Sequence, residues 1–191
     1  MSEEAEEKAS EEASEATELK EREEREELKK YIEEMSEKIK LKTELREKNL
    51  NRVLPQDSFF SKLDSSLKKN TAFVKKLKQF TAAQLDSLLK DMATLNLTKY
   101  ITEVSQALVE AKLKMSDVSA VIILSSHIHQ TYAEFSQHFF DNWQKALTIK
   151  SGERVVNLSK LRVDLRLYCE ILSVGIFSNK VRLKFINIEG Y

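Results

Sequence analysis

The sequence of 191 residues contains one cysteine, one proline and three glycines, and each scarcity excludes a class of protein. Because Cys169 is the single cysteine, no disulfide can form within the chain, which argues against a secreted domain held by disulfides. Three glycines are too few for phosphate-cradling loops or for the tight turns of a small all-β domain. The longest apolar run, from Val118 to Leu124, is interrupted by Ser119 and falls far short of the roughly 20 residues that cross a bilayer. These scarcities favour a helical, non-secreted protein with no membrane partner.

The charges balance overall but are unevenly distributed. The chain has 31 basic and 31 acidic residues, yet residues 1–27 contain 13 glutamates and four basic residues. That segment therefore has a net charge of −9 and the remainder +9. With Leu19 as its one sizeable apolar side chain, the segment cannot bury enough surface to offset its ordering entropy. We expect residues 1–27 to form an acidic tail, either disordered or a solvated helix, and the asymmetry indicates a binding role.

Residues 28–54 have the pattern of a long charged helix. A narrow apolar stripe recurs at spacings of four, three and four residues: Leu28, Ile32, Met35 and Ile39. Several glutamates precede a lysine or arginine by four residues, which stabilises a helix by about 0.2–0.5 kcal/mol per pair. The stripe stops where Lys42 and Arg46 should continue it, so a coiled coil lacks the heptads it needs. The pattern predicts one long helix that ends before Pro55.

A folded unit is expected over residues 57–191, because eight of the nine phenylalanines lie between Phe59 and Phe177. The spacing of Thr81 and Gln84 predicts a capping box. Asn157 is placed to cap the start of a helix, and Gly175 is placed to end that helix in the left-handed conformation. One apolar stripe at helical spacing is Tyr132, Phe135, Phe139, Trp143 and Leu147, and another is Leu158, Leu161, Leu165, Tyr168, Cys169 and Leu172. No segment alternates as a strand does. The pattern predicts an all-α fold of antiparallel helix pairs, either an α-solenoid or an irregular bundle, and a unit length of roughly 40 residues favours the HEAT-like α-solenoid.

The residues that could carry chemistry do not form a recognisable site. His127 and His129 are two residues apart, which turns them about 200° from each other on a helix. A zinc site built from them with His138 and Cys169 lacks the usual ligand spacings. A nucleophilic arrangement of Cys169, a histidine and Asp164 is disfavoured because Cys169 falls on the predicted apolar face. We therefore expect no enzyme, no metal or other cofactor, and no small-molecule substrate.

A basic cluster is the stronger candidate for a functional site. Five lysines lie within eleven residues: Lys68, Lys69, Lys75, Lys76 and Lys78. Such a run can bind the phosphates of RNA. It can also be an ordinary solvated helix face or a protein contact, because Phe73, Val74 and Leu77 are interleaved with the lysines. The second interpretation is favoured.

A second charged group lies near the end of the chain. Arg162, Asp164 and Arg166 alternate with apolar residues, and Asp164 is also within reach of Lys160. We interpret the group as structural ion pairing that fixes helix packing. Recognition of a ligand is the less favoured alternative.

Several strings in the folded part resemble one family. They are SFFSKLDSSLKKNTAFVKKLK at residues 58–78, LLKDMATLNLTKYI at 88–101, VEAKLKMSDV at 109–118, SKLRVDLR at 159–166 and VGIF at 174–177. They resemble the first middle domain in the regulator of nonsense transcripts 2 family, whose proteins are scaffolds in nonsense-mediated mRNA decay. The resemblance covers about residues 40–179 and implies a HEAT-like domain of the type named for the middle domain of eukaryotic initiation factor 4G.

The resemblance also implies what the chain does. It implies a non-catalytic scaffold with protein partners in the mRNA surveillance complex, with direct RNA contact left open, and a cytoplasmic or perinuclear location with access to the nucleus. The alternative is a generic RNA-binding helical-repeat module of the translation initiation machinery. The family segments that bind its helicase and junction-complex partners lie outside the matching region, so those roles attach to no residue here. Because family domains have further helix pairs, we expect an exposed apolar face near Ile171, Val174, Ile176 and Phe177, with marginal stability or self-association.

Overall fold

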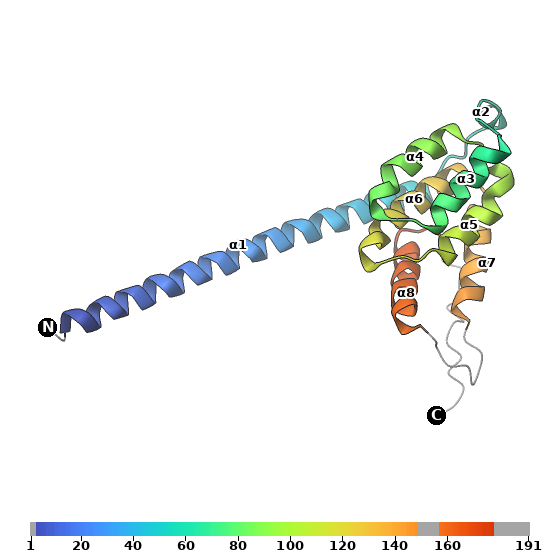
Figure 1. Ribbon diagram of the computed structural model, residues 1–191. Helices are drawn as coiled ribbons and strands as arrows, with labels where there is room; N and C mark the ends of the chain where they lie inside the picture. Colours follow the sequence, from blue (N-terminus) through green and yellow to red (C-terminus); the bar gives the residue numbers. More distant parts are fainter. Residues whose placement is uncertain (1–2, 149–156, 178–191) are drawn as a thin grey trace. The chain divides into compact units, whose positions relative to one another are not determined.

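A computed structural model describes residues 3–148 and 157–177, with side chains described from residue 17 onward. Over these residues the backbone is helical with short connections and has no strand, although Asp64 and Leu95 form an isolated parallel bridge (Figure 1). The α-helices are α1 (Glu3–Leu50), α2 (Asp57–Phe60), α3 (Leu67–Lys78), α4 (Leu85–Thr94), α5 (Ile101–Glu110), α6 (Val118–Thr131), α7 (Phe135–Leu147) and α8 (Leu158–Ser173). Single 3₁₀ turns at Ala82–Gln84, Thr98–Tyr100 and Met115–Asp117 precede α4, α5 and α6. The predicted all-α class is confirmed.

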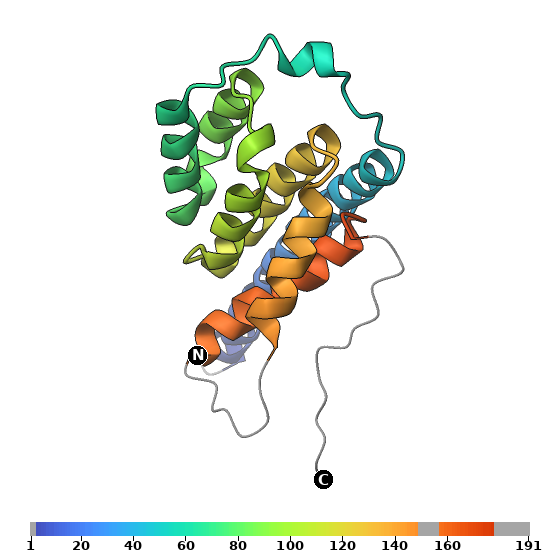
Figure 2. The same cartoon turned by 90° about the vertical axis from the view of Figure 1, so that its right-hand side faces the viewer.

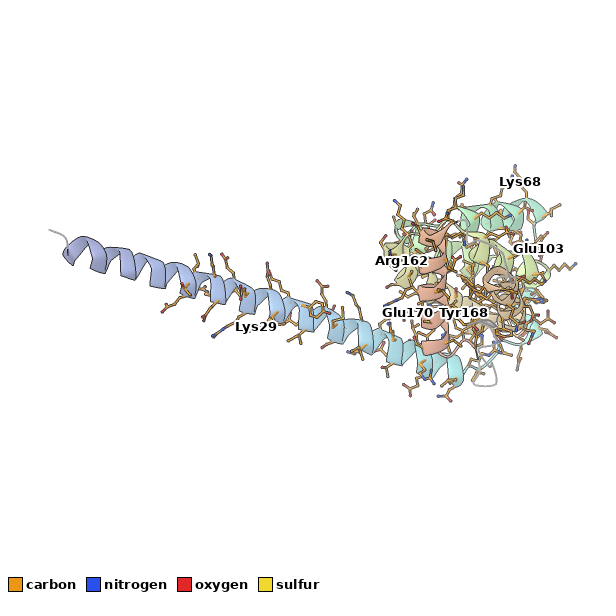
Figure 3. All side chains as sticks on the ribbon, turned by 90° about the horizontal axis from the view of Figure 1, so that it is seen from below. Lys29, Lys68, Glu103, Arg162, Tyr168 and Glu170 are labelled. Carbon is orange, nitrogen blue, oxygen red and sulfur yellow. The ribbon has the colours of Figure 1, made fainter. Side chains whose placement is uncertain are left out.

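The chain divides into two compact units, Met1–Lys42 and Thr43–Tyr191. In the first, the described backbone of residues 3–27 is part of α1, which begins at Glu3. Ion pairs four residues apart support this helix: Glu21 Oε2 lies 3.5 Å from Arg25 Nη2, and Glu34 Oε2 lies 3.4 Å from Lys38 Nζ. The side chains described between residues 17 and 42 are largely solvated, as Lys29 illustrates (Figure 3).

The second unit consists of two layers of helices. Helices α3, α5 and α7 pack side by side in one layer, while α4, α6 and α8 form the other, as Figure 2 shows. Each helix of the first layer is followed in the chain by one of the second, which is the arrangement of stacked HEAT-like pairs. The unit begins within α1, at Thr43, rather than at residue 57 as expected. The part of the expected domain beyond residue 177 lies outside the described residues.

The predicted helix ends are present. The Asn157 side chain accepts a hydrogen bond from the Lys160 backbone N–H at 2.9 Å, which caps α8. The Gln84 side chain accepts from the Thr81 backbone N–H at 3.1 Å, as the expected capping box requires. Gly175 has a φ of 75°, the left-handed conformation that terminates α8.

The core is built around the aromatic stripe of α7. Phe135, Phe139 and Trp143 are each 0% exposed, and the ring centroids of Phe135 and Phe139 are 4.8 Å apart in a stacked geometry. Trp143 meets Phe139 and Tyr168 edge-on, at centroid distances of 6.1 Å in both cases. Rings in such geometries add to the free energy gained by burying their area. The prediction that this stripe faces the core is confirmed.

The predicted apolar face of α8 is partly wrong. Leu158 and Leu165 are 66% and 42% exposed, and the Cys169 thiol is exposed rather than packed. The buried positions are Asp164, Leu167, Tyr168, Glu170 and Ile171, of which Tyr168 alone belongs to the predicted stripe. The buried face of α8 is therefore turned about the helix axis relative to the prediction, and ion pairs satisfy the two carboxylates that lie on it.

The expected exposed apolar face after α8 is also wrong. Ile171 and Val174 are 0% exposed, Ile176 is 2% exposed and Phe177 is 4% exposed. The turn at Gly175 folds the chain back onto α7, so that the ring of Phe177 lies 5.8 Å from that of Phe139 and 5.4 Å from that of Phe140. These residues complete the core instead of leaving it open.

Candidate functional site

The five lysines of the basic cluster are all exposed on α3, but acids neutralise three of them. Lys69 Nζ lies 2.6 Å from Asp64 Oδ2, and Lys76 Nζ lies 2.7 Å from Asp91 Oδ2. Lys78 Nζ lies 3.3 Å from Glu110 Oε2. The hydrogen bond from Lys69 lowers the pKa of Asp64, so this carboxylate stays charged beside its lysine. The cluster is therefore less positive than its sequence suggests.

Lys68 and Lys75 are the members of the cluster with no acidic partner in the part of the chain that the structure describes. They are seven residues apart on α3, which places them on one face about 10 Å apart along the helix axis. Lys68 projects away from the body of the second unit (Figure 3). Two such ammonium groups can contact two phosphates or two carboxylates of a partner, which is a weak electrostatic site.

The charged group on α8 pairs differently from the sequence interpretation. Lys160 Nζ donates to Asp164 Oδ2 at 2.6 Å, and Arg166 Nη2 lies 2.7 Å from Glu170 Oε1. Burial raises the pKa of Asp164, while the Lys160 hydrogen bond opposes that rise. Arg162 is exposed, and no ion pair joins it to Asp164 in the described residues. The two pairs that form are local and stabilise α8, and their geometry offers no ligand site.

The end of α1 carries a polar contact that the sequence analysis missed. Arg46 and Asn49, near that end, and Arg52, just after the helix, reach onto α6 and the end of α8, and we call the three residues the α1 clamp. Asn49 Nδ2 donates to Ser126 Oγ at 3.0 Å and to the Val174 carbonyl at 2.9 Å. Arg46 Nη1 donates to the Ser173 carbonyl at 2.8 Å, where a cation also complements the C-terminal dipole of α8. The spacing of Leu45 and Asn49, which are both buried, is the signal that could have indicated it.

Replacing Asn49 by alanine should lower the free energy of unfolding of the second unit by about 1–3 kcal/mol. The substitution leaves Ser126 Oγ, the Val174 carbonyl and Gln130 Nε2, which donates to Asn49 Oδ1 at 2.8 Å, without their partner. Urea denaturation followed by tryptophan fluorescence measures the change. Asn51→Ala, at an exposed neighbouring position, is the control and should cost less than about 0.5 kcal/mol. Equal effects of the two substitutions would show that the clamp contributes nothing.

Arg52, the third member of the α1 clamp, determines the protonation state and the tautomer of His129. Arg52 Nη1 donates to the His129 carbonyl and lies 3.2 Å from His129 Nδ1. Because a guanidinium has no acceptor, Nδ1 must accept this bond, so the imidazole is neutral with its proton on Nε2. Burial, and then the charge of Arg52, lower the pKa of His129 to about 4.

The structure does not bring the histidines and the cysteine together. His127 is exposed, His129 is buried against Arg52, and Cys169 lies on another helix. Within residues 3–148 and 157–177 no three histidine, cysteine or acidic side chains gather as a metal site would need. Over the same residues, none of the helices combines the length and apolar character that a bilayer span requires.

Comparisons with known proteins agree with this architecture. The family model described as "MIF4G domain" matches residues 67–188. The chain is 49% identical over 156 residues to the human protein "Regulator of nonsense transcripts 2", covering 81% of this chain and 12% of that protein. It is 37% identical over 163 residues to "Regulator of nonsense transcripts UPF2" of Arabidopsis thaliana, covering 82% of this chain and 14% of the relative. The chain thus spans about an eighth of the length of the curated relatives it matches.

A solved structure shows the same fold. The crystal structure of "the first MIF4G domain of human nonsense mediated decay factor UPF2" matches with a TM-score of 0.74 and 49% sequence identity, covering 78% of this chain and 49% of that one. The resemblance seen in the sequence strings is thereby confirmed. The family model covers more than half of the chain and begins at Leu67, the first residue of α3. The chain belongs to the MIF4G domain family.

Proposed function

We propose that this chain is a non-catalytic scaffold segment in nonsense-mediated mRNA decay, and that it acts through protein contacts within an mRNA-bound surveillance complex. The observation that carries the proposal is the 49% identity, together with the shared fold, to the first MIF4G domain of a nonsense-mediated decay factor. At such identity two chains share their fold, as the TM-score of 0.74 also indicates. The relatives' function is therefore the best starting point for this chain.

The surface of the second unit favours protein over RNA as the principal partner. Three of the five clustered lysines are neutralised by acids, whereas phosphate binding needs unpaired cations. The lone cysteine and the histidines lie on different helices or faces, which suits a docking surface better than a reaction centre. The rigid pairs of helices present such a surface.

A pull-down from cell extract with the full chain tests the proposal. We expect proteins of the decay machinery to be recovered equally with and without nuclease treatment, because the contacts are to protein. A Phe139→Ala chain, which we expect to be unfolded in part, is the control for unspecific capture. Loss of these proteins after nuclease treatment would mean that RNA, and not protein contact, holds the chain in the complex.

A weak RNA contact is the second candidate, and Lys68 and Lys75 are the observation that favours it. Each phosphate of single-stranded RNA that is neutralised contributes about 0.7 to the slope of log affinity against log salt concentration. Replacing both lysines by alanine should therefore reduce the slope for a uridine oligomer by about 1.4. The matched variant Lys69→Ala with Lys76→Ala should change it less, because both lysines are already paired. Equal changes from both double variants would contradict this role for Lys68 and Lys75.

A further inference from the structure

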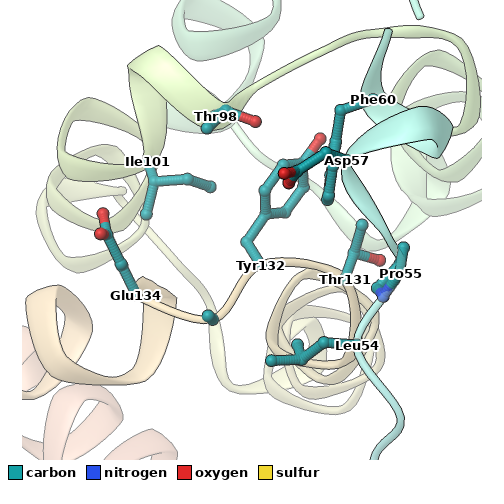
Figure 4. Close-up of a pocket in the computed structure, with 10 residues that line it drawn as sticks. Leu54, Pro55, Asp57, Phe60, Thr98, Ile101, Thr131, Tyr132 and Glu134 are labelled. Atoms are coloured by element: carbon teal, nitrogen blue, oxygen red, sulfur yellow. The ribbon is translucent and has the colours of Figure 1, made fainter. Parts of the chain in front are cut away.

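A small pocket opens beside the extended segment that leads from α1 to α2. Its volume is about 240 Å³, and its lining comes from residues 54–60, from the start of α5 and from the turn between α6 and α7. The inner wall is apolar and fixed, since Tyr132 is 4% exposed and Ile101 is 3% exposed. Figure 4 shows these two side chains surrounded by Leu54, Pro55, Asp57, Phe60 and Glu134. We call it the corner pocket.

The corner pocket is preformed. Tyr132 Oη accepts a hydrogen bond from the Leu97 backbone N–H at 3.1 Å and donates to the Leu95 carbonyl at 3.2 Å, so the ring cannot turn away. The ring of Phe60 packs against the ring of Tyr132, with 5.4 Å between their centroids. Asn96 Nδ2 donates to the Phe60 carbonyl at 3.1 Å, which ties α2 to the same wall. A pocket held in place in this way loses little conformational entropy when it is filled.

The rim of the corner pocket is acidic. Asp57 and Glu134 are both exposed, and none of the residues that line the pocket is a lysine or arginine. Glu134 Oε2 lies 4.0 Å from Nε2 of His138, which forms an ion pair with it only when the imidazole is protonated. The carboxylates thus remain available to a cation, and they repel phosphate.

Apolar side chains beside the rim extend the surface. Val53 and Leu54 are 89% and 41% exposed, and Phe59 is 42% exposed with its ring edge-on to Phe60 at 5.3 Å. Apolar side chains left in solvent next to a fixed pocket are typical of a protein contact. The volume of about 240 Å³ also favours a side chain of a partner protein over a small-molecule ligand, because pockets for such ligands usually enclose about 300–1,000 Å³.

We propose that the corner pocket binds a short peptide segment of a partner protein, with one large apolar side chain against Tyr132 and a neighbouring lysine or arginine on Asp57 or Glu134. The inference deepens the proposed scaffold function, since it names the chemistry of one partner segment. Charge complementarity selects this occupant, because an acidic rim around an apolar pocket suits a basic, apolar peptide and disfavours RNA. A single buried anchor of this kind carries most of the binding energy of a small interface.

Selection of a displayed library of random 12-residue peptides on the immobilised full chain tests the proposal. We expect the selected peptides to contain a large apolar residue flanked by lysine or arginine. Their affinity, measured by fluorescence anisotropy with labelled peptides, should fall about tenfold or more in Ala133→Trp, where the indole fills the pocket from an exposed position. The double variant Asp57→Lys with Glu134→Lys should weaken binding and reverse its salt dependence.

Glu103→Lys is the matched control, because Glu103 is an exposed acid on α5 that does not line the pocket. Unchanged thermal unfolding of each variant verifies the fold. Selected peptides without the apolar and basic pattern, equal binding to Ala133→Trp, or displacement of the peptide by a uridine oligomer would each overturn the inference. If one of these results is found while the pull-down still recovers proteins of the decay machinery after nuclease treatment, only the assignment of the corner pocket is overturned. The proposed scaffold function is then unaffected.

Discussion

Phe139→Ala should lower the free energy of unfolding of the second unit by about 3–5 kcal/mol. Phe139 is 0% exposed and its ring lies within 4.8–6.1 Å, centroid to centroid, of those of Phe135, Trp143 and Phe177. The alanine leaves a cavity where rings from α7 and from the chain after α8 now meet. At the lower end of the range of about 5–15 kcal/mol by which domains are usually stabilised, this loss would leave a measurable fraction of the variant unfolded without denaturant.

The single tryptophan provides the measurement. Trp143 is 0% exposed and packs on Phe139, so its fluorescence reports the exposure of this core during urea denaturation. Leu158→Ala is the control, because Leu158 is 66% exposed, and it should change the free energy of unfolding by less than about 0.5 kcal/mol. A Phe139→Ala loss as small as that of Leu158→Ala would show that the aromatic core is not packed as described.

Acid should destabilise the second unit through His129 before most carboxylates titrate. Its pKa is lowered from the ordinary 6.5 to about 4 in the folded chain, so the folded state favours the neutral ring. The stability that this preference gives is present above pH 6.5 and is lost as the pH falls toward 4. The loss amounts to about 3 kcal/mol in total, of which about 2 kcal/mol falls between pH 7 and pH 5.

Urea denaturation of the wild type and of His129→Gln at both pH values measures this loss. The variant cannot take up the proton, so its stability should fall by about 2 kcal/mol less than that of the wild type. His127→Gln, at an exposed position on the same helix, should keep most of the wild-type pH dependence. Identical pH dependence of wild type and His129→Gln would contradict the buried neutral imidazole beside Arg52.

The features that sequence predicted well are those that local spacing determines. The stripe from Tyr132 to Leu147 repeats at three and four residues with large aromatic side chains, and it forms the core. The Asn157 cap and the Gly175 turn depend on a few neighbouring residues, so both can be recognised from the amino-acid sequence alone.

The features that the sequence did not show depend mostly on residues far apart in the chain. The pairs Lys76–Asp91 and Lys78–Glu110 reduce the positive charge of the lysine cluster, and no helical spacing encodes them. The buried face of α8 follows from its packing against other helices, so its leucines alone mispredicted that face. The α1 clamp joins residues about 80–125 positions apart, as in the bonds of Asn49 to Ser126 and to Val174.

The half-life of an mRNA with a premature stop codon, in cells of the chain's own source, tests the central claim most directly. Removal of the gene should lengthen this half-life, and resupplying the wild-type protein should restore it, while the same mRNA without the premature stop should be unaffected. Resupplying the protein with Phe139→Ala should restore it less completely, because this substitution destabilises the second unit. An unchanged half-life after removal would contradict a role in nonsense-mediated mRNA decay.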